Sequence, residues 1–160
     1  MTSLTMNKSK FLDISGESDF PIESEIFLNA FEAFCSIAQL NGNVEASLVF
    51  CNSQEMQRIN KRFRGVDKTT DVLSFPAEQK AMVNLTDFEE VNFIGEILID
   101  TNYVMEHTGK DRYKDELVEV FVHGLLHLIG YDHQNISQTE EMNLIKSEII
   151  RNITRDGKSE

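Results

Sequence analysis

The sequence predicts a single α+β domain in which a mixed sheet of about four strands is covered by about five helices. A length of 160 residues suits one domain of ordinary size. Segments with the period of an amphipathic helix alternate along the chain with segments of period two, which are typical of strands. No internal repeat or Pro/Gly-rich linker interrupts them. We therefore expect one domain over 1–160, with its core over about 20–155 and a frayed tail over 154–160.

The first half of the chain predicts a helix, a strand and a second helix. Apolar side chains recur at helical spacing over Ile22–Leu40, and this helix should end at Asn41 and Gly42. Apolar and polar residues then alternate over Val44–Cys51, which predicts a half-buried strand.

A short helix follows, because Asn52 and Ser53 offer caps and Gly65 offers a stop. Its inward face should consist of Met56, Ile59 and Phe63.

Two more strands are predicted, Asp71–Phe75 with a stop at Pro76 and Ile94–Asp100. A polar loop of about seventeen residues separates them, and loops of that length are uncommon unless they serve a function or move.

Two helices complete the expected fold. The segment Asp111–Ile129 has so broad an apolar surface that it should form a central, buried helix, which Gly130 ends. Ser137 and Glu140 form a capping box that should open the last helix. Its core-facing side chains should be Met142, Ile145, Ile149 and Ile153.

The composition indicates a soluble protein that we expect in the cytoplasm. No apolar run is long enough to span a bilayer, and the N-terminal segment lacks the apolar stretch of a secretory signal. Cys35 and Cys51 lie in apolar segments without metal-binding spacing, so we expect buried, reduced thiols.

Three of the four histidines are spaced as metal ligands. His123 and His127 lie one helical turn apart on one face, and the turn at Gly130 can bring His133 round as a third ligand. Three imidazoles leave a fourth position open for a water that the metal acidifies, as in a catalytic zinc site. The fourth histidine, His107, should lie on the surface.

The same spacing occurs in metzincin metalloproteases, whose general base is a glutamate directly after the first ligand. Here Gly124 takes that place. A glycine cannot accept a proton from water, so the sequence keeps the metal-binding helix and turn of a metalloprotease but lacks its base.

Net charge is −12, from 15 basic and 27 acidic residues, which is the wrong sign for sequence-independent attraction to a nucleic acid. An RNA partner would therefore need a local basic patch. One candidate runs along the second predicted helix and just past its end, and comprises Arg58, Lys61, Arg62, Arg64 and Lys68. From charge alone, a solvated helix face is the simpler interpretation.

Three motifs resemble the bacterial YbeY family of metal-dependent endoribonucleases and ribosomal RNA maturation factors. HGLLHLIGYDH from His123 to His133 resembles HGxLHLxGYDH, and the segment Asn60–Pro76 resembles N-x-x-[FY]-R-x-x-D-x-P-T-D-V-L-S-F-P. GEI at 95–97 stands where the family usually has Gly-Asp-Ile. The motifs keep the family's order and spacing over roughly residues 20–155.

This resemblance implies a zinc-dependent endoribonuclease that acts on single-stranded RNA, in maturation of the 3′ end of small-subunit ribosomal RNA and in ribosome quality control. Partners would be precursor ribosomal RNA and ribosomal subunit proteins, without a membrane. It also implies that Arg64 lies by the metal cleft, where a planar guanidinium can hold two phosphate oxygens. The candidate catalytic residues are then Arg64 and His123. The candidate substrate-binding residues are Arg64, Arg62, Lys61 and Lys68, and the metal ligands are His123, His127 and His133.

Two positions depart from the family pattern: Thr69 replaces the usual proline, and Glu96 replaces the usual aspartate. Neither departure removes a metal ligand. Asp132 is either an acceptor for a ligating imidazole or a simple turn former. Asp71, Thr70 and Ser74 are explained by capping and strand packing as well as by a role beside Arg64.

Alternatives remain at this level. Nickel or copper would bind the same three imidazoles as zinc. A noncatalytic, metal-stabilised ribosome assembly factor is a second hypothesis, and a zinc peptidase with a base outside the motif is a third.

Overall fold

The computed structural model describes residues 9–77, 91–132 and 134–158, with side chains through Thr154. The described residues form four strands and five helices: β1 (Lys10–Gly16), α1 (Ser24–Ile37), β2 (Asn43–Cys51), α2 (Ser53–Arg64), β3 (Val72–Pro76), β4 (Val91–Asp100), α3 (Thr101–Thr108), α4 (Tyr113–Leu128) and α5 (Ile136–Lys158). The predicted α+β class is confirmed.

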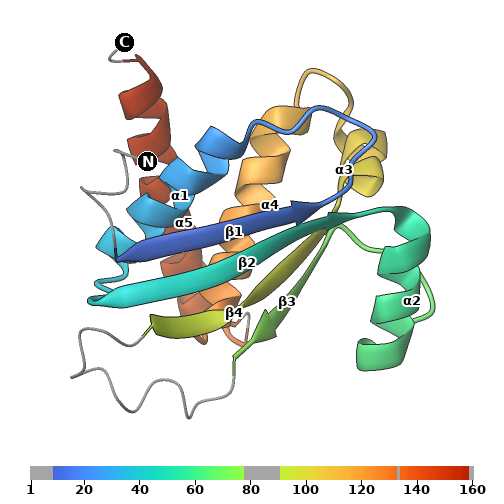
Figure 1. Cartoon of the computed structure of the whole chain (residues 1–160). Coiled ribbons are helices and arrows are strands. Elements are labelled where there is room, and N and C mark those ends of the chain that lie inside the picture. The colour runs from blue at the N-terminus through green and yellow to red at the C-terminus, as the bar shows by residue number, and fades with distance from the viewer. Residues whose placement is uncertain (1–8, 78–90, 133, 159–160) are drawn as a thin grey trace.

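One mixed sheet organises these elements, with the strand order β1-β2-β4-β3 (Figure 1). Strands β1, β2 and β4 are parallel, and β3 pairs antiparallel with β4 at the edge of the sheet. A β-bulge between Glu45 and Ala46 lies opposite Gly95, whose φ is 143°. A Cβ at Gly95 would lie 2.5 Å from the Phe75 carbonyl oxygen, so only glycine fits there.

Helices α1, α4 and α5 pack together on one face of the sheet and enclose the larger core (Figure 1). Alternate strand residues such as Leu48, Ile97 and Ile99 point into it. Helix α4 contributes Phe121 and Leu125, both fully buried, and α5 contributes Met142 and Ile149. The broad apolar surface predicted for α4 is therefore explained by contacts with the sheet and with three other helices, α1, α3 and α5.

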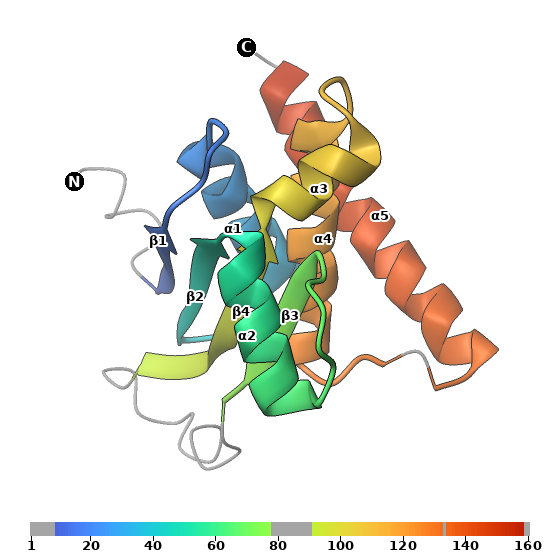
Figure 2. The same cartoon turned by 90° about the vertical axis from the view of Figure 1, so that its right-hand side faces the viewer.

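Helix α2 lies on the opposite face, and strand β3 stands between α2 and α4 (Figure 2). A second, smaller core joins α2 to the sheet through Cys51, Met56, Leu73 and Leu98. The predicted limits of α2 are confirmed, since Asn52 accepts a hydrogen bond from the Glu55 amide and Gly65 ends the helix at φ 73°. The prediction that Phe63 faces inward is wrong, because its side chain is 57% exposed.

Two predictions near the N-terminus also need correction. The sheet begins at Lys10, before the expected core boundary at residue 20, because β1 pairs with β2. Helix α1 ends at Ile37 rather than at Asn41 and Gly42. Gln39 adopts a left-handed conformation with φ 57°, and the Leu40 amide donates to the Cys35 carbonyl at 2.9 Å, which closes the helix earlier.

The second half of the chain contains one helix that the sequence did not predict. Helix α3 starts directly after β4, where the Asp100 carboxylate accepts a hydrogen bond from the Tyr103 amide at 3.1 Å. Strand β4 begins at Val91 rather than Ile94, and α4 begins at Tyr113. Residues 78–90, most of the predicted loop, lie outside the described residues.

The last helix begins differently from the prediction. Asn135, and not a Ser137–Glu140 capping box, caps α5 by accepting a hydrogen bond from the Gln138 amide at 2.8 Å. The helix continues to Lys158, through most of the tail that was expected to fray.

Candidate functional site

Two imidazoles converge at the C-terminal half of α4. His123 and His127 are half-buried, and their Nε2 atoms lie 2.9 Å apart. The ring centroids are 4.5 Å apart with an interplanar angle of 74°. The i, i+4 spacing thus produces the common focus that the sequence predicts. Two imidazole nitrogens at one focus suit a borderline-soft divalent metal.

The turn after α4 also follows the prediction. Gly130 has φ 104°, and the Tyr131 amide donates to the Leu126 carbonyl at 3.1 Å. His133, the expected third ligand, lies outside the described residues. Within the described ranges, no group of three or more His, Cys, Asp or Glu side chains is placed to hold a metal ion. The third ligand therefore stays a prediction.

The two histidines face a cavity of about 680 Å³ between α4, β3 and the end of α2. Arg64, Asp71 and Ser74 line it as well, together with Tyr131 and Asp132 from the turn. Residues from both faces of the sheet meet here because β3 is the edge strand. The cavity is therefore an open site that joins the histidine-bearing helix α4 to the basic end of α2.

Arg64 is the last residue of α2, and its guanidinium reaches around the sheet edge to this cavity. Its Nη2 donates a hydrogen bond to the Ser74 carbonyl oxygen at 2.7 Å. Its Cζ lies 5.2 Å from the centroid of the Phe75 ring. The side chain is exposed, so most of its donors face solvent at the cavity rim.

Among the described members of the predicted basic patch, only Arg64 lines the cavity. Lys61 lies 3.6 Å from the Asp67 carboxylate, and Arg62 lies over the Phe63 ring. Lys68 is exposed on the connection that follows α2. Arg58 forms an ion pair of 2.6 Å with Glu55 on the exposed surface of α2.

Gly124 does not face the cavity. A Cβ there would lie 3.1 Å from Ser74 Oγ and 3.2 Å from two Ile97 carbons. Glycine at this position lets α4 approach β3 and β4 closely, and Ser74 Oγ donates to the Gly124 carbonyl at 3.3 Å. The position that carries the base in metzincins is therefore a packing contact with the sheet in this fold.

The acidic residues around the site differ in their surroundings. The Asp71 carboxylate accepts hydrogen bonds from the Val72 amide at 2.8 Å and from Thr70 Oγ1 at 3.2 Å, which favours the capping interpretation. Asp132 is exposed at the cavity. Its two predicted roles, acceptor for a ligating imidazole and turn former, both stay predictions. Burial raises the pKa of Glu116 on α4, and the nearby carboxylates of Glu119 and Asp71 add to that rise.

Tyr131 is a cavity residue that the sequence analysis did not single out, although it lies inside the histidine motif. Its hydroxyl donates to Glu141 Oε1 at 3.4 Å. Burial, followed by repulsion from Glu141, raises the pKa of this phenol, so it stays protonated at neutral pH.

The two departures from the family pattern lie away from the cavity lining. Thr69 Oγ1 donates a hydrogen bond of 2.6 Å to Asp100 Oδ2, a fully buried carboxylate. The hydroxyl thus satisfies a buried acceptor, which a proline at this position could not do. Glu96 lies on β4 between Ser47 and Phe75 in the sheet register.

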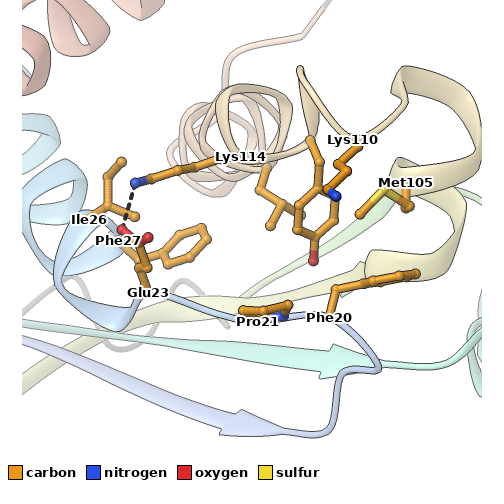
Figure 3. A pocket seen from close by; sticks show the side chains of 10 residues that line it. Phe20, Pro21, Glu23, Ile26, Phe27, Met105, Lys110 and Lys114 are labelled. Atoms are coloured by element: carbon orange, nitrogen blue, oxygen red, sulfur yellow. Dashed lines mark ion pairs between the residues drawn. The ribbon is translucent and has the colours of Figure 1, made fainter.

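A second cavity, of about 410 Å³, is lined mainly by apolar side chains such as Phe20, Ile26 and Met105 (Figure 3). An ion pair of 2.6 Å between Lys114 and Glu23 lies at its wall. Among the described residues, no histidine or cysteine lines it, in contrast to the first cavity with its two histidines.

The remaining predictions for polar residues agree with the structure. Cys35 and Cys51 are buried free thiols, and burial raises the pKa of each to about 12. His107 is exposed on α3 and stacks on Tyr103. Among the described helices, none is both long and apolar enough to cross a membrane.

The chain is similar to known proteins in both sequence and fold. The family model described as Endoribonuclease YbeY matches residues 14–154. A Campylobacter fetus protein named Endoribonuclease YbeY is 39% identical over 127 residues, covering 72% of this chain and 88% of the relative. A Francisella philomiragia protein of the same name is 32% identical over 142 residues, covering 87% and 88%.

The solution structure of TM1509 from Thermotoga maritima is similar with a TM-score of 0.58 and 26% identity. The match covers 93% of this chain and 95% of that one. Sequence and fold agree, and the chain belongs to the YbeY family.

Proposed function

We propose that this chain is a metal-dependent endoribonuclease that cleaves single-stranded RNA. The observation that carries the proposal is the cavity in which two convergent imidazoles face an exposed guanidinium. Curated relatives with this family's name are endoribonucleases, and they cover most of the chain. A cavity with metal ligands on one wall and an arginine on the other suits a phosphodiester substrate.

The metal ligands in this proposal are His123, His127 and His133. The donor set fits zinc, since neutral imidazoles in a partly open site are typical of catalytic zinc, while nickel and copper accept the same ligands. Such a metal would supply Lewis acidity and a nucleophile at neutral pH.

Arg64 has the role of binding and orienting the scissile phosphate. Its Nη2 is held by the Ser74 carbonyl, and its remaining N–H groups face the cavity. Charge that develops on the phosphoryl oxygens would be stabilised by this guanidinium without rearrangement of the protein. In hydrolysis, water forms a bond to phosphorus, the bond to the leaving oxygen breaks, and that oxygen gains a proton.

The biological role that we propose is maturation of the small-subunit ribosomal RNA 3′ end and ribosome quality control in the cytoplasm. The family resemblance supports this role. The net charge of −12 supports a need for ribosomal subunit proteins, because an acidic chain attracts free RNA weakly. The same charge favours the second candidate, a noncatalytic assembly factor that uses the metal for stability.

Cleavage of a labelled ribosomal RNA precursor separates these candidates. The zinc-loaded protein is incubated with the precursor, with and without small ribosomal subunits, beside a metal-free sample. Cleavage that requires the metal supports the nuclease. Binding to subunits without cleavage in any sample would favour the assembly factor, and cleavage of a casein substrate would favour a peptidase.

A further inference from the structure

Phe63 is exposed where a core residue was expected. It follows Met56 and Ile59 at helical spacing on α2, and Met56 is completely buried. Phe63 lies one turn further along, and 57% of its surface is in solvent. Its ring contacts the Phe75 ring of β3 edge to face, with centroids 5.5 Å apart and an interplanar angle of 73°. The Phe75 contact anchors the ring, and more than half of the residue's surface stays in solvent.

A guanidinium accompanies each of these two rings. Arg62 Cζ lies 5.3 Å from the centroid of Phe63, and Arg64 Cζ lies 5.2 Å from that of Phe75. Among the described residues, neither arginine forms an ion pair with a carboxylate. In a chain of net charge −12, this is a local concentration of unneutralised positive charge beside exposed aromatic surface.

Aromatic rings interleaved with cations suit single-stranded nucleic acid, because bases stack on the rings and phosphates pair with the cations. A protein partner would meet the same apolar ring, but two adjacent guanidinium groups without carboxylate partners favour a polyanion. The path from the ring to the cavity is continuous, since Arg64 contacts Phe75 and also lines the cavity.

We propose that Phe63 is a stacking platform for one base of the RNA strand, with Arg62 beside that base. The strand then continues past Phe75 to Arg64, which places a phosphate in the histidine cavity. This inference rests on the proposed function, and it adds a base-binding position outside the metal site. Stacking tolerates any base, so the position gives affinity and register rather than strict sequence specificity.

The test is a double-mutant cycle in which one change is made in the protein and the other in the RNA. A short single-stranded RNA is prepared intact and as a series with one abasic site at each position. Affinities of the wild-type protein and of Phe63→Leu are measured by fluorescence anisotropy. Loss of one stacking partner should weaken wild-type binding roughly five- to hundredfold at one position of the series. Phe63→Leu should bind intact RNA more weakly by the same factor and be insensitive to the abasic site at that position.

Two control variants separate stacking from folding. Phe63→Tyr keeps the aromatic ring and should retain wild-type affinity. Phe11→Leu removes another exposed phenylalanine, 37% exposed on β1 at the far edge of the sheet, and should leave binding unchanged. Circular dichroism melting should show Phe63→Leu, Phe63→Tyr and Phe11→Leu all folded, because neither Phe63 nor Phe11 belongs to either hydrophobic core.

The outcomes distinguish this inference from the proposed function. Wild-type cleavage together with an unchanged affinity of Phe63→Leu would overturn the stacking role alone. An equal loss for Phe63→Leu on every abasic RNA would also overturn it, since no single base would then be coupled to the ring. A metal-loaded wild type that neither binds nor cleaves any single-stranded RNA would refute the proposed function itself.

Discussion

The two faces of the sheet hold the site in different ways. On the face of α1, α4 and α5, the histidine-bearing helix packs against the sheet and three other helices, so its backbone is held from several directions. On the opposite face, α2 is attached through a much smaller core, and its last turn projects beyond it with Phe63 and Arg64 exposed. Metal ligands need fixed positions, whereas an RNA strand is better served by side chains that can adjust.

Ser74 on β3 connects the two faces. Its hydroxyl donates to the Gly124 carbonyl on α4, and its carbonyl accepts a hydrogen bond from Arg64 at the end of α2. One residue of an edge strand therefore sets the separation between the histidine helix and the guanidinium. The difference between the faces predicts which substitutions abolish chemistry, which weaken the substrate contact and which alter stability.

The largest effect is expected at His127, on the rigid face. His127→Ala removes one of two convergent imidazoles, so metal affinity and RNA cleavage should each fall by at least about a hundredfold. Metal content by mass spectrometry and a cleavage assay would measure both. His107→Ala, an exposed histidine on α3, is the matched control and should leave both unchanged. Full metal occupancy of His127→Ala would contradict the ligand assignment.

Arg64→Ala tests the exposed face. Loss of a charge-stabilising donor typically lowers catalytic efficiency about a hundred- to thousandfold, and we expect that range for kcat/KM on RNA. Stability should change by no more than about 1 kcal/mol, because the side chain is exposed. Arg58→Ala on the same helix removes only an ion pair with Glu55 and should retain activity. Global unfolding of Arg64→Ala would make the arginine a structural residue.

Gly124→Val tests the contact between the two faces. The added carbons would overlap with Ser74 and Ile97, and overpacking of this kind costs about 1–3 kcal/mol. Urea unfolding should show that loss. Gly124→Glu, which would supply the metzincin base, should gain no peptidase activity, because the side chain would point at the sheet. Peptidase activity in a folded Gly124→Glu protein would revive the peptidase hypothesis.

The smallest effect concerns Glu116 on α4. Its pKa is raised from the usual 4.5 by burial and by neighbouring carboxylates, so the native state holds this proton more tightly than the unfolded state does. The ionised form therefore lowers stability once the pH rises above 4.5, and this cost is absent at lower pH. Glu116→Gln should be more stable at pH 7 by no more than about 0.5 kcal/mol. Thermal melts at neutral and acidic pH would show whether the gain disappears in acid.

Elements with local signals could be predicted from the sequence. Asn52 and Gly65 mark the ends of α2 because capping and the left-handed stop depend on those residues alone. Strand β1 was missed since an edge strand gains its stability from pairing with β2, a partner far along the chain. Helix α3 was not predicted, because its local signal is the N-cap residue Asp100, and that residue was assigned to the preceding strand.

The same distinction applies to the site. The focus of His123 and His127 follows from helical geometry, and it could be predicted directly from their spacing. The position of Arg64 beside them depends on how α2 and β3 meet, and it was expected only through the family resemblance. The exposure of Phe63 could not be predicted, because helical periodicity indicates a face and does not indicate where the small core beneath it ends.

The order of the strands has a consequence for how the chain folds as it is synthesised. Strand β4 lies inside the sheet but comes last in sequence among the described strands, and β3 has no other strand partner there. Strand β3 therefore cannot be fully paired until Ile99 has been made, and α4 follows later still. Pairing of β4 with β2 joins segments about forty residues apart, and such non-local contacts form more slowly than local ones. In a nascent chain, the last turn of α2 with Arg64 is therefore made well before the α4 residues that complete the cavity.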